Sequence, residues 1–169
     1  MNPFTTKKHE EFRMRIRKFA EEVIRPEARK LDREERFSPE LTQKMAGQGL
    51  FGIAIPEEYG GQGMDYMALV IAVEELARID GSQAATITAV NSLGIGPIYN
   101  YGTEEQKQKY LPPIIRQGRT WAFGLTERNA GSDSGSTMTQ AELKDGHWTI
   151  NGSKMFISNS ASELSAGIT

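Results

Sequence analysis

Two short stretches, residues 121–136 and 154–160, hold the residues whose types and spacing could do chemistry. The first runs from apolar and aromatic residues into a loop of glycine and serine, and the second is expected to be a strand. Alternate residues of a strand face the same way, so Phe156 and Ser158 would share a face. Together the two stretches could form a wall for a flat, hydrogen-bonding ring that carries a phosphate tail.

The loop around Gly131 and Ser132 could hold the phosphate. Glycine would let the backbone approach a ligand closely, and successive backbone amides beside a hydroxyl suit an anion. A plain β-turn is the other interpretation of this loop. Thr126, at the end of an expected strand, could hydrogen-bond the edge of a heterocycle or merely close a turn. Each feature is weak alone, so the prediction depends on their combination.

The composition excludes several other kinds of site. The 169 residues are 38% hydrophobic and 25% charged, which is ordinary for one globular domain, or for one domain and part of a second. Without cysteine there is no disulfide, thiolate zinc site or cysteine nucleophile. His9 and His147 are far apart and are expected at the surface, so no metal site is predicted.

Charge and hydropathy indicate the surroundings of the chain. The net charge of −2 comes from mixed signs and gives no basic surface for nucleic acid. No apolar run approaches membrane-spanning length, and the N-terminus has no apolar signal core. The sequence therefore predicts a soluble protein inside the cell, with no nucleic-acid partner and no membrane insertion.

The first 118 residues are predicted to form an all-α helical bundle. Phe12, Ile16 and Phe19 recur at helical spacing within residues 6–35, and Pro26 is expected to kink or split that helix. Further helices are expected to start at residues that can cap a first turn, namely Ser38, Asp65, Ser82 and Thr103.

Residues 119–169 are predicted to form part of an antiparallel, β-barrel-like domain. The expected strands are rich in β-branched and aromatic residues and lie at 121–126, 138–143, 147–151, 155–159 and 166–169. Asp145-Gly146 and Asn151-Gly152 are typical hairpin turn pairs. The last expected strand reaches the end of the sequence, so we expect the chain to be the front part of a longer protein.

Three motifs in order, GLTE at 124–127, AGSD at 130–133 and GSKMFISN at 152–159, resemble the flavin-binding middle domain of acyl-CoA dehydrogenases. The resemblance continues upstream through IPEEYGG at 55–61 and YGTEEQK at 101–107. It covers almost the whole chain. It implies a multidomain α+β fold, an all-α N-terminal helical bundle followed by the β-barrel-like middle domain, that is truncated here before a C-terminal helical bundle.

The resemblance implies FAD as the cofactor and assigns residues to it by motif position. These cofactor-binding residues are Phe123, Gly124, Leu125, Thr126, Gly131, Ser132, Phe156, Ile157 and Ser158. Thr126 would meet the pyrimidine edge, Gly131 and Ser132 the pyrophosphate, Phe156 the ring face, and Ser158 the region of N5. Many members have tryptophan and threonine at the last two positions. Substrate contacts are implied for Ser132, and for Ala89 and Leu93 at the acyl end.

The implied reaction is α,β-dehydrogenation of an acyl-CoA thioester, as in fatty acid metabolism, with hydride transfer to flavin N5. The family's catalytic glutamate belongs to the C-terminal helical bundle, so no catalytic residue is predicted within 1–169 and the chain alone is expected to be inactive. A homodimer or homotetramer is implied, with electron-transferring flavoprotein as partner. The implied location is the bacterial cytoplasm, or the mitochondrial matrix in a eukaryote.

Other functions stay open at this point. An acyl-CoA oxidase or an enoyl-CoA reductase would share the fold and differ in what reoxidises or reduces the flavin. A non-catalytic partner subunit or binding module would keep the fold without the base.

Overall fold

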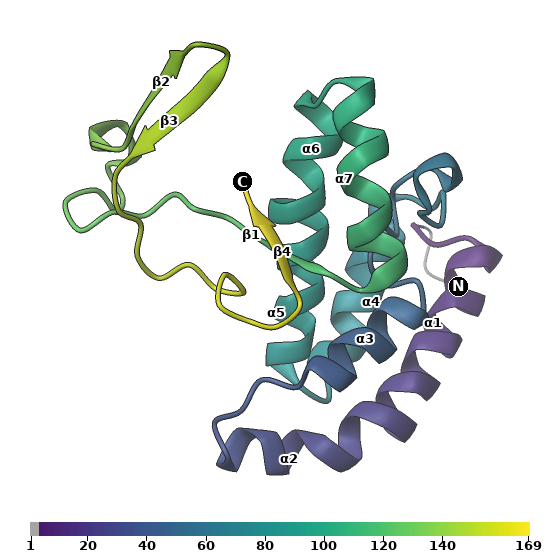
Figure 1. Ribbon diagram of the computed structural model, residues 1–169. Coiled ribbons are helices and arrows are strands. Elements are labelled where there is room, and N and C mark those ends of the chain that lie inside the picture. Colours follow the sequence, from purple (N-terminus) through teal and green to yellow (C-terminus); the bar gives the residue numbers. More distant parts are fainter. Residues whose placement is uncertain (1–3) are drawn as a thin grey trace.

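Helices make up the N-terminal two thirds of the chain, as the sequence predicts. The computed structural model describes residues 4–169. Its helical part, residues 4–118, contains α1 (Lys7–Phe19), η1 (Ala20–Ile24), α2 (Arg25–Arg33), α3 (Pro39–Gly47), η2 (Glu57–Tyr59), α4 (Tyr66–Ala77), α5 (Gly81–Ala89), η3 (Val90–Ile95), α6 (Gly96–Tyr101) and α7 (Glu104–Gln117). Figure 1 shows α1 and α2 on one side of this bundle and α5, α6 and α7 on the other.

Most helix starts lie where the sequence predicts them. The side chains of Ser38, Asp65 and Thr103 each accept a hydrogen bond from a backbone amide of the first turn. The prediction that Ser82 caps the next helix is wrong, because α5 already begins at Gly81. Its cap is Asp80, whose carboxylate accepts from the backbone amides of Ser82 and Gln83 at 2.8 and 3.3 Å.

Two prolines lie inside continuous helical runs, and each follows a π-helical turn. The π-helical segments η1 and η3 come directly before α2 and α6, and each of these helices has proline as its second residue, Pro26 and Pro97. Proline lacks an amide hydrogen, and its ring clashes with the carbonyl four residues earlier in a regular α-helix. A π-turn, which bonds i to i+5, lets the helix continue. Pro26 therefore neither splits nor ends the first helical run.

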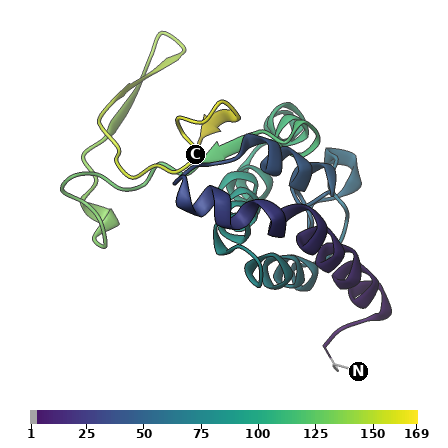
Figure 2. The same ribbon diagram turned by 90° about the horizontal axis from the view of Figure 1, so that it is seen from below.

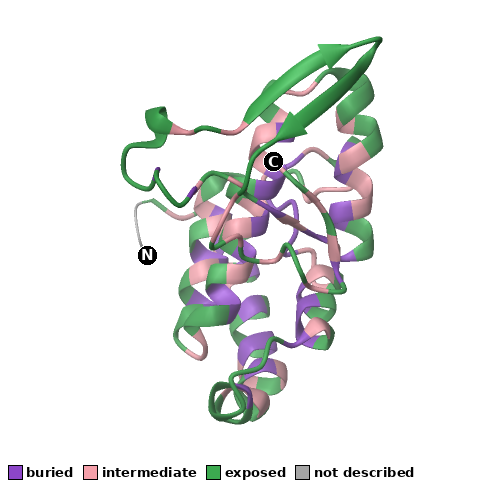
Figure 3. Ribbon diagram, turned by 60° about the vertical axis from the view of Figure 1, so that its left-hand side comes forward, coloured by how far each residue is buried: buried purple, intermediate pink, exposed green. Residues whose placement is uncertain are grey.

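One continuous apolar core holds the helical part together. Its largest fully buried side chains come from nearly every helix and from the loop after α3; they are Phe51, Ile16, Ile24, Met45, Leu50, Ile53, Ile71, Leu76, Ile87, Ile95, Leu111 and Ile114. Apolar residues at helical spacing give each helix one buried stripe. In Figure 3 these stripes face one another between the helices.

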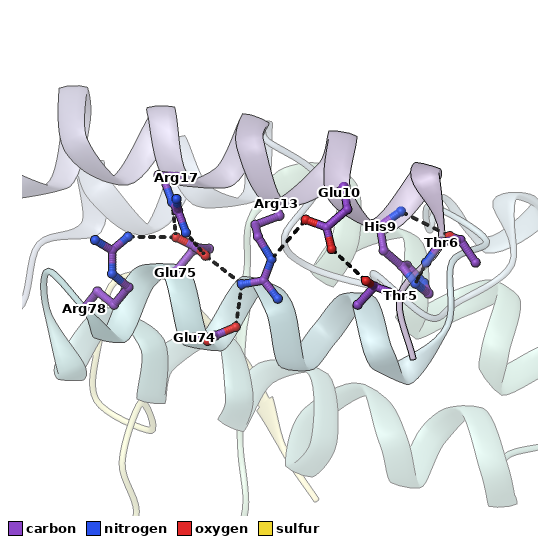
Figure 4. A network of polar contacts seen from close by, with 9 residues as sticks. All are labelled: Thr5, Thr6, His9, Glu10, Arg13, Arg17, Glu74, Glu75 and Arg78. Atoms are coloured by element: carbon purple, nitrogen blue, oxygen red, sulfur yellow. Dashed lines mark hydrogen bonds and ion pairs between the residues drawn. The ribbon is translucent and has the colours of Figure 1, made fainter. Parts of the chain in front are cut away.

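A polar network joins α1 to α4 beside this core (Figure 4). Glu75 is only 1% exposed and accepts hydrogen bonds from Arg13, Arg17 and Arg78 at 2.7 to 3.0 Å. These bonds, above all those from Arg17, lower the pKa of Glu75 to about 2. The carboxylate is therefore buried as a charged group with three cationic partners.

His9 lies at the other end of the same helix pair. It is buried, so the expectation of a surface position is wrong for His9, whereas His147 is exposed. The Thr6 amide donates to its Nδ1 at 3.2 Å, which leaves Nε2 to carry the hydrogen and donate to Asp65 at 2.9 Å. Since Asp65 caps α4, one imidazole connects the starts of two helices.

The sheet part, residues 119–169, consists of two separate strand pairs. Its elements are β1 (Thr120–Ala122), η4 (Ser134–Ser136), β2 (Gln140–Lys144), β3 (His147–Asn151) and β4 (Ser165–Ile168). The antiparallel expectation holds for β2 and β3, but β1 and β4 pair in parallel. The strands of this small sheet part do not close into a barrel within the described residues. Figure 1 places β1 and β4 beside α5 and α6.

The hairpin of β2 and β3 stands away from the helices (Figure 2). It turns at Asp145-Gly146, where both residues have positive φ, as the turn pair predicts. Two cross-strand pairs, Ala141 with Ile150 and Leu143 with Trp148, lie on the same face and make it entirely apolar. All ten strand residues are exposed, so this face has no cover within the described residues.

The strand expected at 155–159 does not form. Residues 152–160 are loop and turn, and Phe156 and Asn159 have positive φ values of 59° and 70°. Asn151-Gly152 is consequently not a hairpin turn, because no strand follows it to pair with β3. Among residues 4–169, no helix is long and apolar enough to cross a membrane.

Candidate functional site

A hollow of about 250 Å³ lies where the helical part meets the sheet part. Its helical side is the end of α5 and the η3 turn. Its sheet side consists of two walls, residues 121–126 in and after β1 and residues 156–159 in the loop before β4. Its lining residues are Ala89, Leu93, Trp121, Ala122, Phe123, Leu125, Thr126, Phe156, Ile157, Ser158 and Asn159.

The hollow brings together most of the residues that the sequence predicts for a site. Phe123, Leu125 and Thr126 meet Phe156, Ile157 and Ser158 there, and the expected substrate residues Ala89 and Leu93 form the helical side. Gly124 lies behind them, where an added Cβ would come within 2.9 Å of Ile168. Gly131 and Ser132 do not line the hollow and lie on an exposed loop before η4.

Phe156 lies beside the hollow but not in the way the sequence predicts. Its ring is 85% exposed and its backbone turns through a left-handed conformation, so Phe156 and Ser158 do not share the face of a strand. A non-glycine residue with positive φ is uncommon and often marks a functional constraint. Phe156 therefore offers a large apolar surface that no other described side chain covers.

The polar groups at the hollow are available to a ligand. The hydroxyls of Thr126 and Ser158 make no hydrogen bond within residues 4–169. The Met155 amide donates to the Thr126 carbonyl at 2.9 Å and holds the two walls together. Exposed aromatic surface beside unpaired hydroxyls fits one face and the polar edge of a flat heteroaromatic ring. The hollow is open and below the usual 300–1,000 Å³ of an enclosed ligand pocket.

The helical side of the hollow is attached to the last strand. The Thr169 hydroxyl donates to the Leu93 carbonyl at 3.0 Å, and the Thr169 amide donates to Ala122 at 2.9 Å. Gly94 in η3 allows the close approach of β1, because an added Cβ would lie 2.9 Å from the Cβ of Trp121. These contacts fix the distance between η3 and β1.

An ion pair next to the lining residues of the hollow was missed from the sequence. The buried carboxylate of Glu127 accepts from Lys154 Nζ at 2.8 Å and from the backbone amides of Met138 and Thr139. These bonds, with that from Lys154 the largest influence, lower the pKa of Glu127 to about 2. Both residues stand inside the two motifs, at GLTE and GSKM, but nothing in their local patterns indicates that they meet.

A second hollow of about 680 Å³ lies between α2 and the start of α5. Its rim carries charges of both signs, including Arg29, Asp32 and Arg36, and it contains none of the predicted site residues. The described residues also include no cluster of three or more histidine, aspartate or glutamate side chains suited to a metal ion. The smaller hollow is therefore the candidate site.

The family relationship of the chain follows from comparison with known proteins. The model of the acyl-CoA dehydrogenase N-terminal domain matches residues 6–118, and that of the acyl-CoA dehydrogenase middle domain matches residues 122–166. The chain belongs to the acyl-CoA dehydrogenase family.

Two curated relatives illustrate the range of activities that similar chains carry. The short-chain specific acyl-CoA dehydrogenase of Clostridium acetobutylicum is 46% identical over 154 residues, which are 91% of this chain and 41% of the relative. The 3-(aryl)acrylate reductase of Clostridium sporogenes is 44% identical over 154 residues, with the same coverage of 91% and 41%.

Solved structures agree with the fold. Butyryl-CoA dehydrogenase from Megasphaera elsdenii matches with a TM-score of 0.88 and 37% identity, over 94% of this chain and 43% of that one. A chain from a study of the electron transferring flavoprotein of Acidaminococcus fermentans matches with a TM-score of 0.91 and 41% identity, over 95% and 42%. The chain spans about two fifths of the length of these relatives.

Proposed function

We propose that this chain supplies the flavin wall and part of the acyl pocket of an FAD-dependent acyl-CoA dehydrogenase that converts an acyl-CoA to the 2-enoyl-CoA. The observation that carries the proposal is the hollow between η3 and β1, where six expected cofactor residues and two expected substrate residues come together. Family membership and the relative named as short-chain specific support a neutral acyl-CoA substrate.

The chain's own residues would bind and orient the reactants. Phe156 and Phe123 would cover one face of the isoalloxazine ring with apolar surface, and the hydroxyls of Thr126 and Ser158 would donate to its polar edge. Positioned donors of this kind stabilise charge that develops on the acceptor. Ala89 and Leu93 would border the acyl chain and exclude water from it.

FAD, if bound at these walls, would supply a hydride acceptor: the β-hydrogen would leave with its electron pair, the α-proton would pass to a carboxylate, and a carbon–carbon double bond would form. We propose that this carboxylate belongs to the part of the family's length that residues 1–169 do not cover. Gly131 and Ser132 would meet the pyrophosphate from their exposed loop.

We further propose that residues 1–118 and 119–169 are separate domains. We also propose that the protein is a homodimer or homotetramer and that electron-transferring flavoprotein is its electron acceptor.

A reductase acting in the opposite direction is the second candidate. The relative named 3-(aryl)acrylate reductase is nearly as similar to this chain as the short-chain dehydrogenase is. The same wall would hold reduced flavin against the double bond of an enoyl-CoA or an acrylate. In the dehydrogenase direction a saturated acyl-CoA reduces the flavin, and in the reductase direction an unsaturated substrate oxidises the reduced flavin.

Absorbance of the purified protein tests the proposal. Protein expressed from the complete reading frame should be yellow, and butyryl-CoA should bleach the flavin without added reductant. Thr126→Val and Ser158→Ala should each weaken FAD binding by about tenfold, the loss that corresponds to one hydrogen bond to the ring. Thr149→Val, on the exposed polar face of the hairpin, is the matched control and should bind FAD normally.

Two results would contradict the proposal. A colourless protein that takes up no FAD from solution would exclude the cofactor. A yellow protein that butyryl-CoA does not bleach, but whose chemically reduced flavin is reoxidised by crotonyl-CoA or cinnamate, would favour the reductase.

A further inference from the structure

Glu127 is a buried carboxylate whose hydrogen bonds all come from the sheet part. Its side chain is 4% exposed, and its oxygens accept from Lys154 Nζ at 2.8 Å, from the Met138 amide at 2.7 Å and from the Thr139 amide at 3.0 Å. A buried carboxylate needs several hydrogen-bond donors, because burying a charged group without partners costs so much free energy that the group becomes protonated instead. The segment before β2 is therefore tied to the residue that follows Thr126.

Lys154 completes the connection from the other side. Its ammonium group donates to Glu127 and also to the Leu125 carbonyl at 3.0 Å, and its side chain is 27% exposed. Leu125 belongs to the wall formed by residues 121–126, and Glu127 follows that wall directly. The adjacent Met155 amide bonds the Thr126 carbonyl.

The two residues stand next to the site without touching the hollow. Neither Glu127 nor Lys154 lines it, yet Glu127 follows Thr126 directly and Lys154 precedes Phe156 by two positions. No regular strand pairing holds residues 152–157. The placement of Phe156 and Ser158 opposite Thr126 consequently depends on the few contacts made by Lys154 and Met155.

We propose that the Glu127–Lys154 pair is a positioning device that sets the spacing between the two walls of the hollow. This inference rests on the proposed function for its consequence in FAD binding, but the spacing itself can be measured without any cofactor. The pair acts through Thr126, Phe156 and Ser158, so Glu127 and Lys154 are positioning residues and not catalytic ones.

The chain offers a matched control for this pair. Lys144 and Glu142, on the hairpin, are 2.9 Å apart, close to the 2.8 Å between Lys154 and Glu127, but their side chains are 63% and 66% exposed. A solvent-exposed pair of this kind contributes little to structure. Lys144→Met therefore removes the same chemical group from the same part of the chain without disturbing the walls.

The experiment combines amide exchange with FAD titration in protein expressed from the complete reading frame. The variants are Lys154→Met, Glu127→Gln, the double variant, Lys154→Arg and the control Lys144→Met. Hydrogen exchange is followed at the amides of Met138, Thr139 and Met155 in protein stripped of flavin. FAD affinity and the shape of the bound flavin spectrum are then measured on the same samples.

We expect Lys154→Met and Glu127→Gln each to speed exchange at those three amides and to weaken FAD binding about tenfold, the loss of one charge-assisted hydrogen bond. The double variant should be little worse than either single one, because both remove the same interaction. Lys154→Arg should restore most of the protection and the wild-type spectrum. Lys144→Met should behave as wild type.

Other results would overturn the inference. Unchanged exchange in Lys154→Met and Glu127→Gln would show that the pair does not hold the walls. Faster exchange with wild-type FAD affinity and spectrum would show that wall spacing does not serve the site. If the wild-type protein takes up no FAD, the proposed function fails, and the exchange rates alone decide whether the pair sets the spacing. Should Lys154→Met not fold, Glu127→Gln and Lys154→Arg still give both measurements.

Discussion

The helical part and the sheet part of this chain differ in where their apolar side chains lie. In the helical part, apolar stripes from all the long helices meet in one core. In the sheet part, the buried apolar residues are Ala122, Ala130 and Leu164, while Leu143, Trp148 and Ile150 are exposed on one face of the hairpin. The helices of the helical part thus bury their apolar side chains against one another, whereas a two-stranded hairpin needs further contacts to be stable.

The largest expected effect comes from the core of the helical part. Ile16→Ala should lower the free energy of unfolding by about 3 kcal/mol, because it removes buried methyl groups and leaves a cavity. Ile16 is fully buried in α1. Urea unfolding of the 169-residue chain, followed by helix circular dichroism, measures the change. A loss below about 1 kcal/mol would mean that the core packs less tightly than its burial indicates.

Glu75 should give the next largest effect. Glu75→Gln would remove the charge that Arg13, Arg17 and Arg78 share and should cost about 2 kcal/mol, less than for a fully buried pair because two of the arginines are half exposed. Glu74→Gln is the matched control. Glu74 is 56% exposed and bonds only Arg13 of these arginines, so its loss should stay within about 0.5 kcal/mol. Equal effects would refute a special role for burial.

Acid should weaken the same contact. The pKa of Glu75 falls from its ordinary value of 4.5 to about 2 in the folded chain, chiefly through hydrogen bonds from Arg17. A lowered pKa means that the stabilisation is complete above pH 4.5 and is lost as the pH falls through about 2. Urea unfolding at a series of pH values should show this loss in the wild type and a flatter profile in Glu75→Gln. Parallel profiles would contradict it.

The smallest effect is expected on the hairpin, and it sharpens the comparison most directly. Ile150→Ala makes the same substitution as Ile16→Ala, but Ile150 is 69% exposed. In the 169-residue chain it should change stability by no more than about 0.5 kcal/mol. A loss as large as that of Ile16→Ala would show that another surface covers the apolar face in solution.

The sequence predicted helices more successfully than strands because helix signals are local. Ser38, Asp65 and Thr103 stand directly before their helices, and each accepts a hydrogen bond from the backbone amide three residues further on. The start of α5 was misplaced because two capping residues, Asp80 and Ser82, lie close together. The carboxylate of Asp80 reaches two backbone amides and the Ser82 hydroxyl itself.

Strand prediction failed where pairing decides the structure. Residues 155–159 have the composition of a strand, but composition reports how well side chains fit a half-buried sheet and not whether a neighbouring strand is present. Only the Met155 amide bonds across to another segment, and Phe156 then turns away. The parallel pairing of β1 with β4 joins residues 45 positions apart, at Thr120 and Ser165, and has no local signal.

The sequence predicted which residues form the candidate site but not how they are arranged. Motif order identified Thr126, Phe156 and Ser158, which do lie beside one hollow. The Glu127–Lys154 contact was not predicted, because charged residues in glycine-containing loops usually face solvent and their partners depend on the tertiary fold. Trp121 and Asn159 also line the hollow without having been expected there.

Pro97 has a consequence for the junction between the two parts of the chain. Because proline has no amide hydrogen, it cannot donate to the Leu93 carbonyl four residues earlier, and the Thr169 hydroxyl donates to that carbonyl instead. An irregularity inside a helix therefore provides the anchoring point for a strand that is distant in sequence. The border of the candidate site therefore depends on Pro97, a residue that does not itself line the hollow.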